Sequence, residues 1–331
     1  MTVDSQILRA LRSLDEDSVS GAELSQRLGI SRAAIWARIE ELRSLGYDIQ
    51  ASPHRGYQLL DSPDLLHADD LLSRLDGSQV IGRDIRVFQK TTSTNDIVEK
   101  LARDGVAEGV VVFAESQTQG RGRLGRAWVS PPGKGLWFSV LLRPQIAPQA
   151  VTRLTIAAAA SLARTVQSVT GVVPRIKWPN DLLVNGRKIS GILTELSAEL
   201  DHVKYVILGI GMNINLTEAD FPADLKPIAT SLRVAAKREI NRPEFAAELL
   251  RQLDRDYRRL SEGQFQRVAE EWEALSGTLG SEVEVRTGDR VVRGRAESLD
   301  PDGALLVRTQ HGRIERIIGG DVSLRPPDTK L

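Results

Sequence analysis

Hydrophobic residues in the first sixty positions recur at the spacing of short helices. The two apolar stripes comprise Ile7, Leu8, Leu11 and Leu14, and then Ile35, Ile39 and Leu42. Ser20 and Ser31 stand where helix N-caps are expected, and Gly29 lies between them as a left-handed helix stop. The pattern predicts one helix over 22–28 and another from residue 32, which is typical of a helix-turn-helix.

A short β-hairpin is expected directly after these helices. Polar and apolar residues alternate over 47–52 and again over 57–60, on either side of a Pro-His-Arg-Gly turn at 53–56. A helix-turn-helix followed by a hairpin predicts a winged helix, which we place at residues 1–62.

The rest of the chain changes pattern twice. Strand-like and helical segments alternate first, at 85–88, 94–103, 110–114, 137–142, 151–169, 205–210 and 242–260. This alternation predicts a mixed α/β domain over 67–273. Short β runs separated by turns then predict a small β-barrel over 278–327. The predicted class is a multidomain α+β protein, and 331 residues suit two or three domains.

Composition excludes several functions. With 44 basic and 44 acidic residues the net charge is zero, which argues against nonspecific coating of nucleic acid. The absence of cysteine excludes disulfides, zinc–thiolate sites and cysteine nucleophiles, and the four histidines are too far apart to suggest a histidine-rich metal site. The start of the chain does not resemble a signal peptide, and the uncharged run 154–163 is too short to span a membrane. We therefore expect a cytoplasmic protein with no membrane partner.

The segment 117–128, with the sequence QTQGRGRLGRAW, is the most informative for chemistry. Glycine lets the backbone approach a ligand closely, and arginine presents a planar fork that suits phosphate or carboxylate. Residues 117–143 contain five basic side chains and no acidic one. The order of residues is not that of a P-loop. A flexible basic surface loop is the alternative interpretation.

A second informative segment is KWPND at 177–181, followed by Asn185-Gly186 between two apolar runs. Asn-Gly predicts a tight hairpin, which would bring Lys188 back toward Lys177, Asn180 and Asp181. Two lysines suit an anionic substrate, and Asp181 could hold Mg²⁺ or orient a lysine. An ordinary hairpin with solvated lysines is the alternative.

Two further segments are less specific. Gly209 and Gly211 lie two residues apart in a strand-like run, so they share one face, which a ligand or a packed helix would then approach. A hydroxyl-rich cluster at 91–96 precedes a helical segment, and simple N-capping explains one or two of its residues.

Together these motifs resemble the biotin–protein ligases, and more closely the bifunctional bacterial form that is also the biotin operon repressor. Ser-Thr-Asn, Gly-Arg-Gly-Arg-x-Gly-Arg, Lys-Trp-Pro-Asn-Asp, Arg-Lys-x-x-Gly-Ile-Leu and Gly-x-Gly-x-Asn occur in the family's order. The resemblance covers essentially the whole chain. It implies a winged helix, a central ligase domain similar to class II synthetases, and an SH3-like C-terminal barrel.

The resemblance also implies the activity. The family uses biotin both as substrate and as corepressor precursor: it activates biotin with ATP and Mg²⁺ to biotinyl-5′-adenylate and transfers biotin to a lysine of a carrier protein. One such carrier is the biotin carboxyl carrier protein of acetyl-CoA carboxylase. No covalent enzyme nucleophile is required.

The resemblance implies a role for each position of this sequence that matches a motif of the family. Biotin-side positions are Ser93, Thr94, Asn95, Gln117, Gly120, Arg121, Gly122, Arg123, Lys188, Gly209 and Gly211. Nucleotide-side positions are Arg121, Arg126, Trp128, Lys177, Asn180, Asp181, Asn213 and Arg325. The catalytic candidates are Arg123, Lys188 and Asp181, and no metal ligand is assigned. Leu124 departs from the arginine of the best-studied bacterial form, and the stretch after Asn215 does not match that form closely.

The winged helix is expected to bind operator DNA through Ser31, Arg32, Arg38 and Arg55. The first 60 residues contain seven basic and eight acidic residues, so a single copy would bind weakly and a ligand-dependent homodimer is expected. A winged helix used only for protein contacts is the alternative. For the whole chain, the alternatives are a ligand-sensing transcription factor without ligase activity and a lipoate or octanoate ligase.

Overall fold

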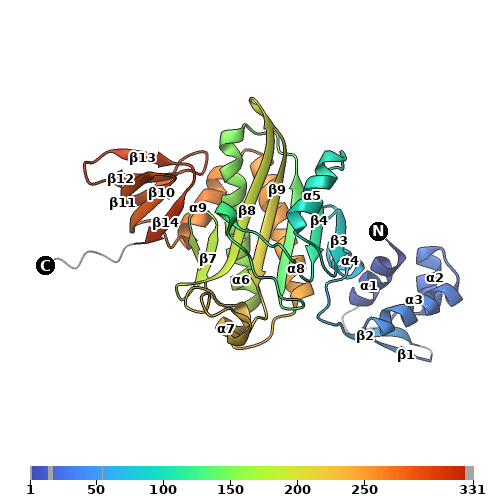
Figure 1. The fold of residues 1–331 in the computed structure, drawn as a ribbon. Helices are drawn as coiled ribbons and strands as arrows, with labels where there is room; N and C mark the ends of the chain where they lie inside the picture. Colours follow the sequence, from blue (N-terminus) through green and yellow to red (C-terminus); the bar gives the residue numbers. More distant parts are fainter. Residues whose placement is uncertain (1, 14–17, 54, 325–331) are drawn as a thin grey trace.

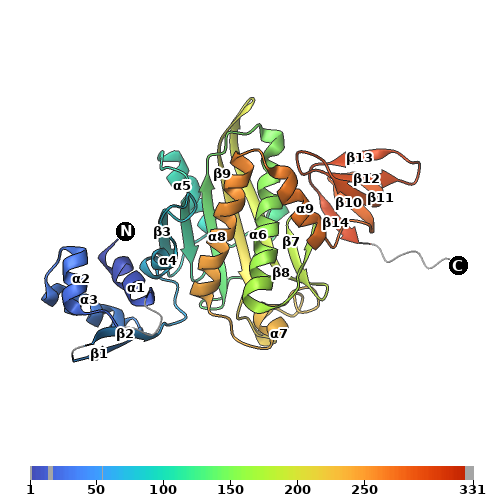
Figure 2. The same ribbon diagram turned by 180° about the vertical axis from the view of Figure 1, so that it is seen from behind.

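The computed structural model of the chain describes residues 2–13, 18–53 and 55–324. A helical domain with a two-stranded wing is followed by a central sheet with helices and then by a small all-β domain (Figure 1). The first and the last of these lie at opposite ends of the central domain, as the two opposite views agree (Figures 1 and 2). Within the described residues no helix is both long and apolar enough to cross a membrane.

The N-terminal part is a winged helix-turn-helix, as predicted. Its elements are α1 Val3–Arg12, α2 Gly21–Leu28, α3 Arg32–Ser44, β1 Asp48–Ser52 and β2 Gly56–Asp61. The Ser20 and Ser31 hydroxyls accept backbone N–H groups at the starts of α2 and α3, and Gly29 ends α2 with a φ of 67°. Ile35 and Ile39 of α3 are fully buried. Leu14 lies outside the described residues.

The centre of the molecule is a seven-stranded mixed sheet in the order β3-β4-β5-β9-β8-β7-β6. Only β3 and β4 pair in parallel among the described strands, and the remaining neighbours are antiparallel. The strands are β3 Asp84–Phe88, β4 Val110–Ala114, β5 Gly135–Leu142, β6 Arg175–Lys177, β7 Asp181–Val184, β8 Arg187–Glu199 and β9 His202–Asn213.

Helices cover the two faces of this sheet unequally. The helices and 3₁₀ turns are α4 Ala68–Arg74, α5 Thr94–Arg103, η1 Arg123–Gly125, η2 Pro148–Val151, α6 Thr152–Thr170, η3 Glu218–Asp220, α7 Leu232–Ala236, α8 Arg242–Ser261 and α9 Phe265–Leu275. α6 and α8 lie over one face (Figure 2) and enclose the main core. α5 packs on only part of the other face.

Strand alternation in β9 shows how this asymmetry makes room for a site. Leu208 and Ile210 belong to the core under α6 and α8, whereas Ile207 packs under α5 on the opposite face. Because successive side chains alternate, Gly209 and Gly211 share the face of Ile207 but lie beyond the cover of α5. The uncovered half of this face is the floor of a cavity.

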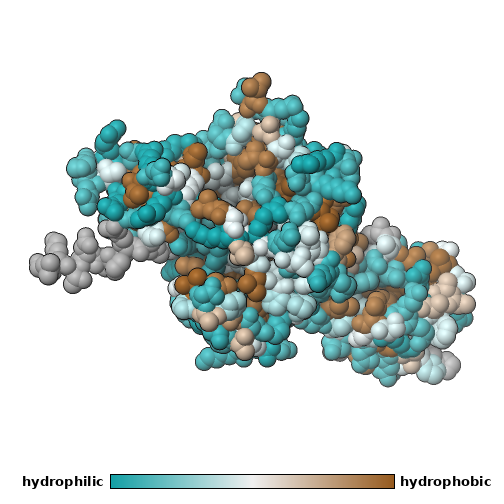
Figure 3. Space-filling model, in the orientation of Figure 1, coloured by the Kyte–Doolittle hydropathy of each residue, from teal (hydrophilic) through white to brown (hydrophobic). Residues whose placement is uncertain are grey.

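The β8–β9 hairpin extends past the rest of the sheet. Leu200 at its turn has a φ of 41° and is 99% exposed. The space-filling view shows the apolar tip protruding from the molecule (Figure 3). A fully exposed leucine contributes nothing to the core of this chain.

The C-terminal part is a five-stranded antiparallel sheet in the order β13-β12-β11-β10-β14. Its strands are β10 Glu282–Thr287, β11 Arg290–Leu299, β12 Leu305–Thr309, β13 Ile314–Ile317 and β14 Asp321–Leu324. The predicted β runs all fall on strands. α4, α7, α9 and β14 were not predicted; α4, α7 and β14 are too short for their apolar pattern to stand out in the sequence.

Candidate functional site

One cavity of about 560 Å³ opens on the half of the sheet that α5 leaves uncovered. Its floor is formed by β8 and β9, and three segments surround it: 120–128, 216–229 and the start of β14. The volume lies in the range of small-molecule sites. Three parts of the chain that are far apart in sequence therefore meet around one ligand-sized space.

Neutral polar groups gather at the start of α5. Gln117 Oε1 accepts the backbone N–H of Thr94 at 2.8 Å, and Thr94 Oγ1 lies 2.7 Å from Ser139 Oγ. The Ser139 hydroxyl donates to Asn95 Oδ1 at 2.5 Å. Thr94, Asn95 and Ser139 are buried, Gln117 is half-buried, and all four are bonded to one another, so their positions are fixed before a ligand arrives.

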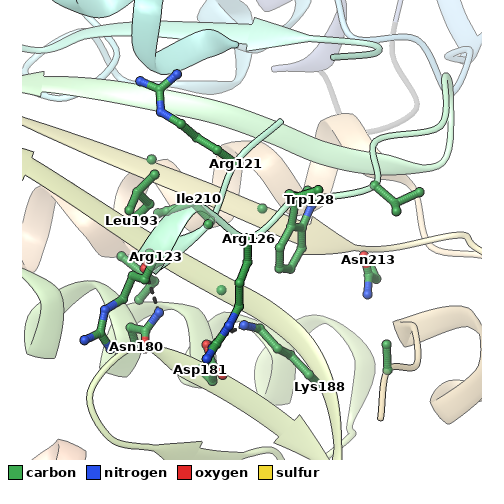
Figure 4. A pocket seen from close by; sticks show the side chains of 18 of the residues that line it. Arg121, Arg123, Arg126, Trp128, Asn180, Asp181, Lys188, Leu193, Ile210 and Asn213 are labelled. Carbon is green, nitrogen blue, oxygen red and sulfur yellow. Dashed lines mark hydrogen bonds and ion pairs between the residues drawn. The ribbon is translucent and has the colours of Figure 1, made fainter. Parts of the chain in front are cut away.

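Charged groups gather around the β7–β8 turn. Asn185 and Gly186 have φ values of 50° and 77°, as a tight Asn-Gly turn requires, and Lys188 Nζ lies 2.6 Å from Asp181 Oδ1. The same ammonium lies 5.3 Å from the ring centroid of Trp128, a cation–π contact. Lys188 and Asp181 point toward each other below Trp128 (Figure 4). The predicted return of Lys188 to Asp181 is confirmed.

The three arginines of the Gly-Arg segment take different directions. Arg121 turns away from the Lys188 cluster (Figure 4) and meets Asp96 and Glu195. Arg123 donates to Asn180 Oδ1 at 3.0 Å and to the Gly320 carbonyl at 3.2 Å, and Arg126 pairs with Asp321. Burial lowers the pKa of Arg123, against the raising effects of Asp321 and Asp181. An anion bound near Arg123 would therefore be stabilised by an incompletely compensated positive charge.

Glycines in the floor make room for the functional side chains. A Cβ on Gly209 would lie 2.3 Å from Asn95 Oδ1, and a Cβ on Gly211 would lie 2.5 Å from the Trp128 ring. Both distances are too short for real atoms, so a side chain at either position would displace its neighbour. The sequence predicted that another group approaches these two glycines closely. In the structure, that group is Asn95 at Gly209 and Trp128 at Gly211.

A segment with little regular structure, 216–229, forms one wall of the cavity. Its backbone is tied to Lys188, whose N–H donates to the Ile228 carbonyl at 2.8 Å and whose carbonyl accepts from Thr230. Lys134 and the backbone of Thr217 donate to Asp220, and these bonds lower the pKa of Asp220 to about 2. Two backbone hydrogen bonds therefore hold this wall next to the catalytic candidate Lys188.

The structure brings nearly all of the predicted site residues to this cavity. Those that line it are Ser93, Thr94, Asn95, Gln117, Arg121, Gly122, Arg123, Arg126, Trp128, Lys177, Asn180, Asp181, Lys188, Gly209, Gly211 and Asn213. Gly120 does not line it but lies just behind, where a Cβ would be 2.6 Å from the Trp128 carbonyl oxygen. Arg325 lies outside the described residues. Which of these positions contact biotin and which the nucleotide stays a prediction.

The predicted DNA-binding residues lie on the winged helix, far from this cavity. Ser31 caps α3, Arg32 is its first residue, and both are exposed, as is Arg55 in the wing. Arg38 forms ion pairs with Glu41 at 2.9 Å and Asp4 at 3.6 Å, so its charge is partly compensated. Trp36 on the same helix is 58% exposed and was not singled out in the sequence.

Several wall residues were missed. Apolar side chains from segment 216–229 and the β14 residues belong to the lining: Phe221, Leu225, Ile228, Gly320, Asp321, Val322 and Ser323. Glu195 and Ser139 were also missed, since both lie within strands that look like ordinary core. Only the polar interruption of an apolar strand by Ser139 could have indicated its role. No group of three or more His, Asp or Glu suited to a metal ion occurs among residues 2–13, 18–53 and 55–324.

The fold and the cavity define a class of protein. A winged helix is joined to an α/β domain whose pocket combines fixed neutral groups with lysines and arginines, and a small β domain completes the wall. This is the architecture of a ligase domain fused to a DNA-binding domain.

Comparisons with known proteins identify the family. The model of the biotin/lipoate A/B protein ligase family matches residues 87–213, an HTH domain matches 4–58, and the biotin protein ligase C terminal domain matches 278–325. The bifunctional ligase/repressor BirA of Bacillus subtilis is 36% identical over 323 residues, covering 98% of this chain and 99% of that protein. BirA of Escherichia coli is 32% identical, covering 92% of each. The chain belongs to the family of bifunctional biotin–protein ligases that carry a repressor domain.

A solved structure supports the same assignment. Biotin protein ligase from Aquifex aeolicus in complex with biotin and ATP aligns with a TM-score of 0.64 and 30% sequence identity. The alignment covers 74% of this chain and all of that one. The predicted fold class and family resemblance are therefore confirmed.

Proposed function

We propose that the protein activates biotin with ATP to biotinyl-5′-adenylate, transfers biotin to a lysine of a carrier protein, and represses genes through its winged helix. Ligase activity and a repressor domain follow from the family to which the chain belongs. The proposal adds Mg²⁺, the carrier, the operator DNA, a homodimer and the roles of individual residues.

A single arrangement carries this proposal: one cavity has neutral hydrogen-bonding groups at Thr94, Asn95 and Gln117 and cationic groups at Lys188 and Arg123. Biotin has a neutral ureido ring at one end and a carboxylate at the other. The fixed neutral groups suit the ring, and the cations suit the carboxylate and the phosphate that it attacks. Leu193 and Trp128 line the same cavity, where an aliphatic chain could lie.

The first step brings two anions together, because the biotin carboxylate attacks the α-phosphorus of ATP and pyrophosphate leaves. Lys188 and Arg123 offset this repulsion and stabilise the charge that develops on the phosphoryl oxygens. Mg²⁺ commonly keeps several waters and is held by one or two carboxylates plus substrate phosphates. Asp181 fits that role because its carboxylate lines the cavity, and the bound ion would neutralise the leaving pyrophosphate.

The second step needs protection and a deprotonated amine. The mixed anhydride is readily hydrolysed, so the Gly-Arg segment and segment 216–229 serve to exclude water. The carrier lysine then attacks the biotinyl carbonyl and AMP leaves. We assign Asp181, which lines the cavity, as the carboxylate that assists removal of the proton from that lysine.

Incubation of the protein with biotin, Mg-ATP and a biotin carrier domain tests the proposal. We expect one biotin on one carrier lysine and stoichiometric release of pyrophosphate, measured by mass spectrometry and a coupled assay. Biotin binding without pyrophosphate release would instead support a ligand sensor. Preferential use of lipoate or octanoate would support the other ligase class.

Replacing Lys188 by alanine tests the cationic end of the cavity. Loss of a cation that meets the reacting oxygens is expected to lower adenylate formation by about 10³-fold. Lys204→Ala is the matched control, because Lys204 lies on β9 outside the cavity and pairs with Glu199. Equal rates for the two variants would refute the role of Lys188.

The repressor function is carried by the exposed N-terminus of α3, where Ser31 and Arg32 could enter the major groove. Duplexes selected from a random pool in the presence of biotin and ATP should bind as a complex with two protein copies. We expect Arg32→Ala to weaken this binding without changing adenylate formation. Selection of no duplex would favour a winged helix that contacts only protein.

A further inference from the structure

Glu195 of β8 joins the floor of the cavity to the segment that covers it. Its Oε2 accepts a hydrogen bond from Asn95 Nδ2 at 2.6 Å. Its two oxygens also accept from Arg121, at 3.3 Å from Nε and 3.2 Å from Nη2. One carboxylate thus holds a residue of the floor and a residue of the Gly-Arg segment at the same time.

The partners of Glu195 are themselves constrained from other directions. The Ser139 hydroxyl donates to Asn95 Oδ1, whereas Asn95 Nδ2 donates to Glu195. These two partners together determine the orientation of the Asn95 amide. Gly209 leaves the space in which Asn95 lies. Arg121 Nη1 meets Asp96 Oδ1 at 2.5 Å, so its guanidinium bridges α5 and β8. Although burial alone would lower the pKa of Arg121, Asp96 and Glu195 raise it.

Glu195 is not among the residues that line the cavity, whereas Asn95 and Arg121 are. Its carboxylate therefore acts through these two side chains rather than on the substrate. A two-point contact between a carboxylate and a guanidinium fixes orientation as well as distance. This geometry suits a group that determines where the covering segment rests.

We propose that Glu195 is a positioning residue: it sets Asn95 and Arg121 in one geometry and thereby closes segment 120–128 over the neutral end of the cavity. The inference rests on the proposed function and deepens it. Without this carboxylate Arg121 keeps, among the described residues, a single-point contact with Asp96, and the segment loses its tie to β8. The covering segment would then open more often, and the adenylate would escape or hydrolyse.

The test compares Glu195→Gln with Glu199→Gln, a matched control on the same strand whose carboxylate is 71% exposed and pairs with Lys204. Labelled biotinyl-5′-adenylate is bound to each protein, and its release is followed by tryptophan fluorescence and by chase with unlabelled ligand. Release from Glu195→Gln is expected to be about tenfold faster than from the wild type. In the ligand-free proteins, hydrogen exchange of the Gly122 and Trp128 amides is expected to be faster in Glu195→Gln than in the wild type, and unchanged in Glu199→Gln.

A double-mutant cycle separates positioning from a merely structural effect. If Glu195 acts through Arg121, Glu195→Gln should speed release less in the Arg121→Gln background than in the wild type, because only the contact with Asn95 is then left to lose. Additive effects, or a wild-type release rate in Glu195→Gln, would overturn the proposal. If Glu195→Gln does not fold, Glu195→Asp takes its place, since the shorter carboxylate keeps the charge but cannot reach both partners.

These outcomes are separable from those that test the proposed function. A wild-type protein that forms no adenylate from biotin and ATP contradicts the ligase activity. A wild-type protein that forms it, together with variants at 195 and 199 that release it equally, contradicts only the role of Glu195.

Discussion

The two flanking domains meet the central domain in different ways. The C-terminal domain supplies Gly320–Ser323 to the wall of the cavity and receives Arg123 and Arg126 from the Gly-Arg segment. Among the described residues before Ser93, none lines the cavity. One junction therefore belongs to the site, and the other lies apart from it.

The N-terminal junction is built from arginine side chains of α1, which contact the backbone of α4 and a buried carboxylate. Arg9 donates to the carbonyls of Leu72 and Ser73, and Arg12 meets Asp70 at 2.5 Å. These contacts satisfy carbonyls at the end of α4 and fix α1 against the central domain (Figure 1).

A buried arginine anchors the linker that follows the winged helix. Arg242 is 2% exposed and bonds to Asp64 of the linker and to Glu115, which directly follows β4. Glu115 also accepts the backbone N–H groups of Leu66 and Gly133. The comparison shows that buried ion pairs fix the N-terminal domain and its linker to the central domain. At the C-terminal junction, a half-exposed ion pair lines the cavity.

The largest effect is expected from removing the buried arginine. Arg242→Ala leaves Glu115 buried without its cation, which should lower the free energy of unfolding by about 3–5 kcal/mol. Urea denaturation measures this change. Arg251→Ala, on the same helix, is the control, because that side chain is partly exposed and, among the described residues, meets Glu248 and the Arg74 carbonyl. A loss for Arg242→Ala no greater than for Arg251→Ala would remove the distinction between the junctions.

At the C-terminal junction we expect a smaller effect on stability and a larger effect on substrate binding. Asp321→Asn removes the half-exposed pair with Arg126, so unfolding should change by less than about 1 kcal/mol. Because Asp321 lines the cavity beside Arg123 and Arg126, removing its negative charge leaves both cations less compensated, and the KM for ATP should fall about fivefold while the kcat stays nearly constant. Asp302→Asn is the control, since Asp302 pairs with Arg153 at the same junction but outside the cavity. Equal KM values for the two variants would show that this junction is only structural.

The smallest effect concerns the pH dependence of the N-terminal junction. Burial raises the pKa of Asp4 in α1; Asp69 and Glu41 raise it further, whereas Arg38 and His67 oppose the shift. A carboxyl whose pKa is raised by folding stabilises the protein below its unfolded pKa and loses this contribution as pH rises through the folded value. The difference in Tm between Asp4→Asn and the wild type should therefore be more favourable to the variant at pH 7 than near pH 4. A difference in Tm that is constant with pH would contradict a raised pKa of Asp4 in the folded protein.

The sequence predicted the three-part architecture because each part has a local signal. Caps at Ser20 and Ser31, the Asn185-Gly186 turn and strand alternation all act over a few residues, and the structure contains each of these features. The site motifs were found for the same reason, since their residues are contiguous. Glu195 and Asp321 were not found: Glu195 lies within a strand that looks like ordinary core, and nothing near Asp321 distinguishes it from a surface carboxylate.

What the sequence determined by itself is the identity of the chemical groups and the elements that carry them. Only the tertiary structure decided which groups meet: Arg121 turned to Glu195 rather than to Lys188, and Arg126 to the C-terminal domain. The physical reason is that local hydrogen bonds and hydrophobic periodicity are set by neighbours along the chain. Ion pairs between distant segments depend instead on how the sheet and its flanking domains pack in space.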